Sequence, residues 1–343
     1  MSLDLPLIWA GVIAVAVMLY VWLDGFDLGI GILFPFARSE QDRDVMMNTV
    51  APIWDGNETW LVLGGGGLLA AFPTGYAVLL PALYLPVLMM LLGLILRGVA
   101  FEFRFRGRDL GRRGWGFAFA LGSFVAAFAQ GLVLGGFIQG VRVNAAETAF
   151  AGGPFDWLTP YTLLVAVGVV AGYALLGAGW VILKSEDELH GHARRWAGIA
   201  ATLTVLLLAA VSLATIFVHP QVAARWGVAG GAVDLARLLP RAPAPLLGLL
   251  GFGLVAWGLR RKSHTLPFAG GLLVFLSGYI GLAIGFAPYV VPYQLDFREA
   301  AAPDNALALL LAGTAAALPL ILGYTAYVYW VFRGKVAADA HYH

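Results

Sequence analysis

Residues 6–36 read PLIWAGVIAVAVMLYVWLDGFDLGIGILFPF, and the only charged side chains in this segment are Asp24 and Asp27. A membrane-spanning helix needs about 20 mainly apolar residues. Similar stretches recur along the whole chain, in which 60% of the 343 residues are hydrophobic and 12% are charged. A soluble domain carries roughly twice that charged fraction. The sequence therefore predicts one integral membrane domain over residues 1–343 that crosses the bilayer many times.

The predicted fold is an all-α helical bundle with about nine transmembrane helices. The expected spans are 6–36, 50–72, 76–103, 115–140, 160–183, 195–219, 243–260, 266–289 and 305–333. Lysine and arginine concentrate in the connections after the odd-numbered spans and in the tail. This bias places the N-terminus outside and the C-terminus in the cytoplasm. The connection 220–242 does not follow this bias, because it carries three arginines on the side assigned to the outside.

Composition also limits the class of partner and chemistry. A formal net charge of +1 gives no reason to expect nucleic acid as a partner. Cysteine is absent, which excludes disulfides and thiolate-bound iron–sulfur clusters. The first span follows no basic leader and no small-residue cleavage site, so we expect it to be a retained helix.

Ionisable groups inside spanning segments are rare and mark ion or proton routes. The first signature that contains them reads Asp24-Gly25-Phe26-Asp27-Leu28-Gly29. Asp24 and Asp27 are three residues apart, so on a helix they face the same side. Two such carboxylates cannot both stay ionised easily in a low dielectric, so one is expected to exchange a proton. The glycines would let a neighbouring helix approach. Alternatively, both aspartates are wetted by the following loop and cap backbone groups.

The second signature reads Trp54-Asp55-Gly56-Asn57-Glu58-Thr59-Trp60. Asp55 and Glu58 again have i, i+3 spacing. Each acid taken alone could be a helix cap, because carboxylates are favoured near a helix N-terminus. Two acids and Asn57 at one membrane edge, opposite another aspartate pair, fit a proton-uptake route.

Arg97 and Glu102 close the third span and are candidate supporting charges. Arg97 either extends to the membrane surface or pairs with one of the carboxylates. Glu102 lies so close to the boundary that a solvated position is equally compatible with its sequence context. Gln130, Gln139 and Asn144 either line a cavity or form interhelical hydrogen bonds.

The six histidines fall in loops, at helix ends or in the tail: His190, His192, His219, His264, His341 and His343. None is predicted in the middle of a span, where an axial haem ligand would be expected. If the protein works with haem, another chain is therefore expected to hold it. No metal ligand set is predicted in this chain.

These motifs resemble subunit II of the cytochrome bd-type quinol oxidases, including the cyanide-insensitive branch. The resemblance covers essentially the whole chain. It is carried by the motif 24–31, the run 51–57 that opens the second span, and the stretch 97–104 that closes the third.

The resemblance implies a quinol:oxygen oxidoreductase that reduces dioxygen to water in the bacterial cytoplasmic (inner) membrane. Haem b and haem d (or b in its place) would belong to the partner, subunit I, and none would be ligated in this chain. Subunit II would stabilise the heterodimer and supply part of a proton path at positions matching Asp24, Asp27 and Asp55. Some members hold a quinone in subunit II. Small single-helix subunits and membrane lipids are further candidate partners. Members of the family often have a neutral residue where this chain has Glu58, so the role of Glu58 stays open.

Two other hypotheses use the same residues. A stand-alone proton-coupled transporter would use the same carboxylates, although no inverted repeat or broken midplane helix is evident. A purely structural subunit would use its acids only as caps, and their neutral variants would then leave turnover intact.

Overall fold

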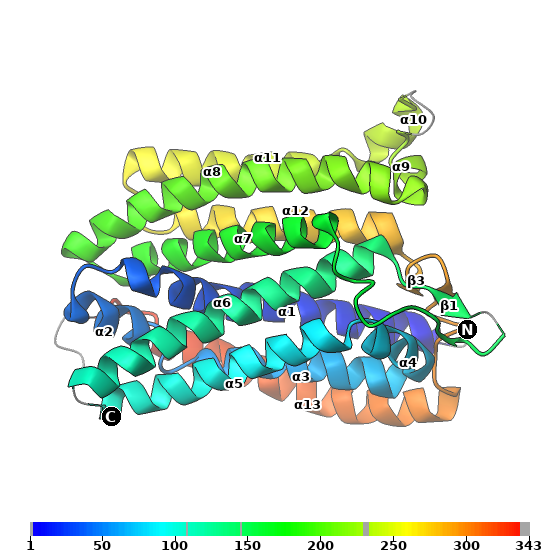
Figure 1. Ribbon diagram of the computed structural model, residues 1–343, viewed down its shortest axis with the longest axis horizontal. Coiled ribbons are helices and arrows are strands. Elements are labelled where there is room, and N and C mark those ends of the chain that lie inside the picture. Colours follow the sequence, from blue (N-terminus) through cyan, green and yellow to red (C-terminus); the bar gives the residue numbers. More distant parts are fainter. Residues whose placement is uncertain (1–2, 108, 145, 229–232, 337–343) are drawn as a thin grey trace.

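A computed structural model describes residues 3–107, 109–144, 146–228 and 233–336 as a bundle of long helices (Figure 1). Arg108, His341 and His343 lie outside the described residues. The elements are α1 (Leu5–Leu33), η1 (Phe34–Phe36), α2 (Glu40–Asn48), α3 (Trp54–Ala71), α4 (Pro73–Ala82), α5 (Tyr84–Arg106), α6 (Asp109–Gln139), β1 (Val143–Asn144), β2 (Ala149–Phe150), α7 (Pro160–Lys184), α8 (Asp187–Val218), α9 (Pro220–Arg225), α10 (Leu235–Leu238), η2 (Leu239–Arg241), α11 (Pro243–Arg261), α12 (Leu266–Phe286), β3 (Tyr289–Val291), β4 (Leu295–Asp296) and α13 (Asp304–Val331).

The long helices run side by side along the longest axis of the molecule (Figure 1). In this view α8 and α11 lie along one side, and α3, α5 and α13 lie along the other. Helix α1 lies between these sides and contacts α3, α6 and α7. The short helix α2 sits at one end of the bundle, and the two hairpins β1–β2 and β3–β4 sit at the other. By the predicted topology, the α2 end is cytoplasmic.

The predicted membrane-spanning bundle is confirmed. In the described part of the chain, eight helices are long and apolar enough to cross a membrane, and their bounds follow the predicted spans closely in most cases. Helices α6 and α8 begin at Asp109 and Asp187, several residues before the predicted spans 115–140 and 195–219. The prediction left out these turns because they contain charged residues and lie outside the apolar stretches.

The second and third predicted spans differ from the structure. Segment 50–72 forms the 18-residue helix α3, which is not among the eight apolar helices. Its two acids and five glycines lower its hydropathy. Segment 76–103 is two helices, α4 and α5, separated at Leu83. Proline lacks a backbone N–H and clashes with the preceding turn, and Pro81 and Pro86 flank this break.

Glycines bring α1 and α7 into close contact, as the sequence predicted. A Cβ atom on Gly29 would lie 1.9 Å from the carbonyl oxygen of Tyr173, and one on Gly25 would lie 2.7 Å from its ring. Any larger side chain at these positions would push the helices apart. On the same face of α1, Phe26 stacks on Trp180 of α7 with ring centroids 4.1 Å apart. The glycines and Phe26 of the first signature therefore build the packing around its two aspartates.

Candidate functional site

Arg97 is buried where α1, α3 and α5 meet. Its side chain is 2% exposed. Its Nη1 atom donates to Asp24 Oδ1 at 2.6 Å, and its Nη2 atom donates to Glu58 Oε2 at 2.7 Å. Of the two interpretations of Arg97, the structure shows the carboxylate pairing and not extension to the membrane surface.

Asp27 lies one helical turn from Asp24 and accepts a hydrogen bond from a neutral side chain. Asn57 Nδ2 donates to Asp27 Oδ2 at 2.8 Å, and the Tyr329 hydroxyl donates to Asn57 Oδ1 at 2.9 Å. The other oxygen, Asp27 Oδ1, is buried and has no hydrogen-bond partner among the described residues. Asp24 and Asp27 are 0% and 2% exposed and lie inside α1, so they are not helix caps.

We call Asp24, Asp27, Glu58 and Arg97 the Arg97 cluster. It contains three carboxyl groups and one guanidinium. Burying a charge without an opposite charge is strongly unfavourable. A cluster with more acids than cations can relieve this imbalance by binding a proton. Chemically, the arrangement can accept, hold and release a proton inside the bundle.

Aromatic side chains surround the Arg97 cluster. Phe26, which lies between the two aspartates in sequence, stacks on Trp180 and contacts the edge of Phe268. Trp54 lies against Phe101 with ring centroids 5.4 Å apart. These rings exclude water from two sides and keep the local dielectric low, which strengthens every charge interaction inside.

A second cluster lies two turns further along α5. Arg104 is 1% exposed and donates to Asp44 Oδ1 at 2.6 Å and to Glu40 Oε2 at 3.0 Å. Arg112 of α6 also pairs with Asp44. Burial by itself raises the pKa of Asp44, but hydrogen bonds from Arg112 and Arg104 outweigh burial and hold that pKa below its usual value. We call these four residues the Arg104 cluster.

The Arg104 cluster was not predicted. Glu40 and Asp44 have i, i+4 spacing in α2, so they share one face of a short helix. That spacing, together with the basic stretch around Arg104, is the feature of the sequence from which the cluster could have been predicted. The cluster ties α2 to α5 and α6 at the predicted cytoplasmic end of the bundle.

Three predicted residues do not join either cluster. Asp55 and Gly56 are exposed in the first turn of α3, and Glu102 is exposed on α5. A Cβ on Gly56 would meet no atom within 4 Å. No side chain forms a capping hydrogen bond at the start of α3, so Asp55 is not a hydrogen-bonded cap. Its neighbours face inward, since Asn57 contacts Asp27 of α1 and Glu58 contacts Arg97 of α5, whereas Asp55 is exposed.

A chain of polar side chains approaches Asp24 from α6 and α7. The Tyr173 hydroxyl donates to Gln130 Oε1 at 2.7 Å, and Gln130 Nε2 donates to the Tyr20 hydroxyl at 2.6 Å. The predicted interhelical hydrogen bonds of Gln130 are therefore present. Tyr20 and Tyr173 were not predicted, although Tyr20 precedes Asp24 by one helical turn.

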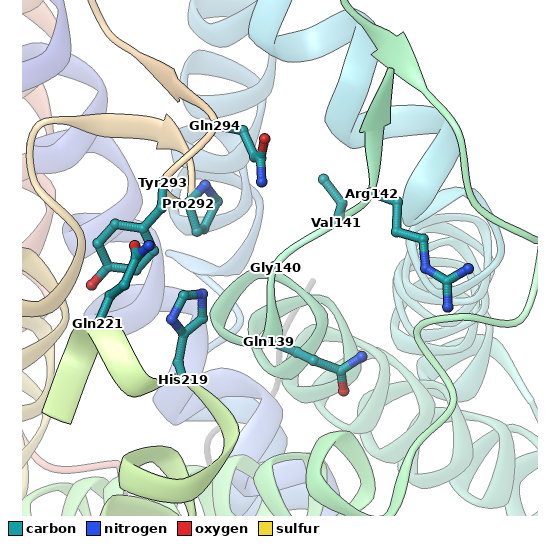
Figure 2. Close-up of a pocket in the computed structure, with 9 residues that line it drawn as sticks. All are labelled: Gln139, Gly140, Val141, Arg142, His219, Gln221, Pro292, Tyr293 and Gln294. Atoms are coloured by element: carbon teal, nitrogen blue, oxygen red, sulfur yellow. The ribbon is translucent and has the colours of Figure 1, made fainter. Parts of the chain in front are cut away.

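The opposite end of the bundle carries a polar pocket of about 330 Å³ (Figure 2). It is lined by Gln139, Gly140, Val141, Arg142, His219, Gln221, Pro292, Tyr293 and Gln294. Gln139 satisfies both predicted roles, because it lines this pocket and also accepts a hydrogen bond from Thr159 at 2.7 Å. Burial lowers the pKa of His219.

The described histidines lie away from the Arg97 cluster. His190 and His192 are in the first turns of α8, His219 follows its end, and His264 links α11 to α12. Within the described ranges, no group of three or more histidine, aspartate or glutamate side chains is arranged to hold a metal ion.

Comparison with known proteins agrees with the fold and the motifs. The family model of cytochrome bd terminal oxidase subunit II matches residues 5–332. The chain is 29% identical over 372 aligned residues to cytochrome bd-I ubiquinol oxidase subunit 2 of Escherichia coli (strain K12), covering 98% of this chain and 96% of that protein. It is 28% identical over 339 residues to cytochrome bd ubiquinol oxidase subunit 2 of Bacillus subtilis (strain 168), covering 96% of each.

A solved structure shows the same fold. A chain of the bd oxidase from Geobacillus thermodenitrificans superposes with a TM-score of 0.73 at 19% sequence identity, covering 96% of this chain and 99% of that one.

Proposed function

Because this chain belongs to the family of cytochrome bd terminal oxidase subunit II, we propose that it supplies proton uptake and assembly functions to a bacterial quinol oxidase. The oxidase would oxidise quinol and reduce dioxygen to water in the cytoplasmic membrane. As a subunit II, the chain works with a partner, subunit I. It is a multi-pass membrane protein and a subunit of an oxidoreductase.

The observation that carries the proton-uptake proposal is the charge imbalance of the Arg97 cluster. One buried arginine pairs with two of the three carboxyl groups, and two carboxyl oxygens, Asp24 Oδ2 and Asp27 Oδ1, lack a hydrogen-bond partner among the described residues. A structural ion pair needs no third acid. A group that binds a proton and passes it on needs an acceptor that the surrounding protein leaves unsatisfied.

The exposure of the acids supports an order in which a proton would reach them on its way into the bundle. Asp55 is exposed in the first turn of α3, and the Glu58 side chain is 27% exposed while it contacts Arg97. Asp27 is fully enclosed. We assign Asp55 and Glu58 to proton entry from the cytoplasm, and Asp27 to holding the proton inside the bundle. Delivery of cytoplasmic protons to the oxygen-reducing centre would make turnover electrogenic without a pump.

The haems are assigned to the partner. Every described histidine lies at a helix end or in a connection, so the side chains offer no histidine at mid-bilayer depth for an axial bond. Haem b and haem d (or b) would therefore be bound by subunit I in a heterodimer, and no step of the chemistry on them is assigned to this chain. A bound quinone, membrane lipids and small single-helix subunits complete the proposed set of partners.

Asp27→Asn tests proton uptake, because it keeps the shape of the side chain and removes its exchangeable proton. We expect oxygen consumption by the purified complex to fall at least about tenfold, with unchanged haem content in the reduced-minus-oxidised spectrum. Asp44→Asn in the Arg104 cluster is the matched control and should retain turnover. Full turnover in Asp27→Asn would show that the subunit is purely structural.

The haem assignment has a separate test. The reduced-minus-oxidised spectrum of the chain purified with its native partners should show haem bands. The same spectrum of this chain isolated alone should show none. Haem retained by the isolated chain would contradict the assignment to subunit I.

A further inference from the structure

Asn57 forms three hydrogen bonds in the interior of the bundle. Its Nδ2 atom donates to Asp27 Oδ2 at 2.8 Å and to the Leu23 carbonyl oxygen at 3.4 Å. Its Oδ1 atom accepts from the Tyr329 hydroxyl at 2.9 Å. Asn57 is 1% exposed, so bulk water does not compete for these bonds. The side chain therefore joins a hydroxyl group on α13 to a carboxyl group on α1.

The orientation of the Asn57 amide decides which form of Asp27 it stabilises. An amide has one donating and one accepting end. The observed orientation directs the N–H group to Asp27, which favours the ionised carboxylate. In the opposite orientation the Asn57 oxygen would face Asp27, and only a protonated Asp27 could bond to it. The Tyr329 hydrogen would also lose the acceptor that Asn57 provides, so Tyr329 stabilises the observed orientation.

The same hydrogen bond distinguishes the two oxygens of Asp27. Oδ2 accepts from Asn57, whereas Oδ1 is buried and has no hydrogen-bond partner among the described residues. A proton on Oδ2 would have to displace the Asn57 N–H group. A proton on Oδ1 would leave that bond in place. Binding and release of a proton at Oδ1 therefore require no rearrangement of Asn57.

Tyr329 lies near the end of α13, a helix that is mostly exposed along its length. The last turn is held to α7 by Lys184, whose Nζ atom donates to the carbonyl oxygens of Phe332 at 2.5 Å and Gly334 at 3.2 Å. Trp180 of α7 also contacts the Tyr329 ring, with centroids 6.1 Å apart. These contacts fix the end of α13 against α7 and keep the Tyr329 hydroxyl within hydrogen-bond distance of Asn57.

We propose that Tyr329 is a positioning residue that holds the Asn57 N–H group toward Asp27, so that Asp27 binds its proton on Oδ1 and releases it readily. Tyr329 acts through Asn57, because its hydroxyl bonds to the amide and not to the carboxyl group. This inference rests on the proposed proton-uptake function and refines it. It names the atom that carries the proton and a residue on α13 that controls its release.

Ionisable side chains from five helices surround the two aspartates. They are Tyr20, Asp24 and Asp27 themselves on α1, Glu58 on α3, Arg97 on α5, Tyr173 on α7 and Tyr329 on α13. On α12, Tyr279 bonds to the Ala14 carbonyl, more than three turns before Asp27. The ionisable residues of α6 lie in its first two turns. All of these groups except Tyr329 remain in the variants below, so a change in those variants reports on Tyr329 and Asn57.

Tyr329→Phe is the direct test. Infrared spectroscopy of the purified complex follows, as a function of pH, the carboxyl absorption that Asp27→Asn removes, and oxygen consumption is measured on the same preparation. Without the hydroxyl, the Asn57 oxygen has no donor and can turn toward a protonated Asp27. Asp27 should then keep its proton to a pH higher by up to about one unit, which matches the loss of one hydrogen bond. Oxygen consumption should fall several-fold, because the proton is released less readily.

Asn57→Leu removes the donor to Asp27 and should cause a shift in the same direction that is at least as large. Adding Tyr329→Phe to Asn57→Leu should cause no further shift, because Tyr329 acts only through the amide. Tyr161→Phe is the matched control, because Tyr161 shares a hydrogen bond of 2.7 Å with Thr215 away from the cluster. It should leave both the absorption and oxygen consumption unchanged. Haem content and thermal unfolding of each preparation identify any loss caused by misfolding.

The inference is overturned if the wild type lacks an absorption that Asp27→Asn removes, or if Tyr329→Phe does not change its pH dependence. A further shift in the double variant also overturns it, because Tyr329 would then act on Asp27 without Asn57. The proposed function fails separately, through full turnover in Asp27→Asn. Loss of turnover in Asp27→Asn together with wild-type behaviour of Tyr329→Phe would reject this inference alone.

Discussion

Arg97 and Arg104 lie seven residues apart on α5, both almost fully buried, and their surroundings differ in charge balance. Around Arg104, the two arginines of the cluster and the neighbouring Arg43 meet two acids, and both acids are partly exposed. Around Arg97, one arginine pairs with Asp24 and Glu58, and a third acid, the buried Asp27, lies one helical turn from Asp24. At the edge of the bundle, every acid of the cluster has an arginine partner. An unbalanced cluster in the interior is driven to bind a proton. The same residue types thus form a structural clamp in one place and, in the function we propose, a proton site in the other.

The largest effect should come from removing the central arginine of each cluster. Arg97→Met leaves buried carboxylates without their cation, which typically costs about 3–5 kcal/mol. Arg104→Met leaves Arg112 to pair with acids that water also reaches, so a loss of about 1 kcal/mol is expected. The midpoint of thermal unfolding of the purified complex measures both.

A second variant checks the reason for the Arg97→Met loss. Adding Asp24→Asn to Arg97→Met removes one of the uncompensated charges and should restore part of the stability. If the double variant is less stable than Arg97→Met, the imbalance of charge is not what the arginine relieves.

Glu58→Gln should have the next largest effect. It keeps the Arg97–Asp24 pair but removes the cluster acid that reaches the surface, at 27% exposure of its side chain. We expect a several-fold loss of oxygen consumption with little change in stability. Glu40→Gln, the matching change in the Arg104 cluster, should leave oxygen consumption unchanged. Equal losses in both variants would remove the functional distinction between the clusters.

The smallest effect concerns the pH dependence of the Arg104 cluster. Hydrogen bonds from Arg112 and Arg104 hold the pKa of Asp44 below its usual value of about 3.9. A lowered carboxyl pKa contributes stability that is present above the usual pKa and is lost as the pH falls through the lowered one. Docking of α2 should therefore stay intact at neutral pH and loosen only in acid. Protection of segment 40–48 from protease or hydrogen exchange, measured as a function of pH, reports the docking of α2. In Asp44→Asn, the loss of protection in acid should disappear.

Much of this organisation could be predicted from the sequence. Hydropathy located the spanning helices, and the i, i+3 spacing placed Asp24 and Asp27 on one face. The pairing of Arg97 was one of two stated alternatives. The packing role of Gly25 and Gly29 was also expected and is confirmed by the approach of α7.

The remainder depends on long-range packing. Tyr173 and Gln130 reach Tyr20 from helices distant in sequence, and nothing in their local context distinguishes them from ordinary helix residues. The outward direction of Asp55 depends on which face of α3 packs on α1. Periodicity cannot resolve that face, because α3 has a short and glycine-rich apolar stretch.

Infrared spectroscopy of the purified complex at neutral pH tests most directly whether the Arg97 cluster stores a proton. We predict the carbonyl absorption of a buried, protonated carboxyl group that is lost in Asp27→Asn. It should persist in Asp44→Asn, because Asp44 pairs with Arg104 and Arg112 outside the Arg97 cluster. If the wild-type complex shows no such absorption, or if the absorption remains in Asp27→Asn, the Arg97 cluster does not store a proton on Asp27.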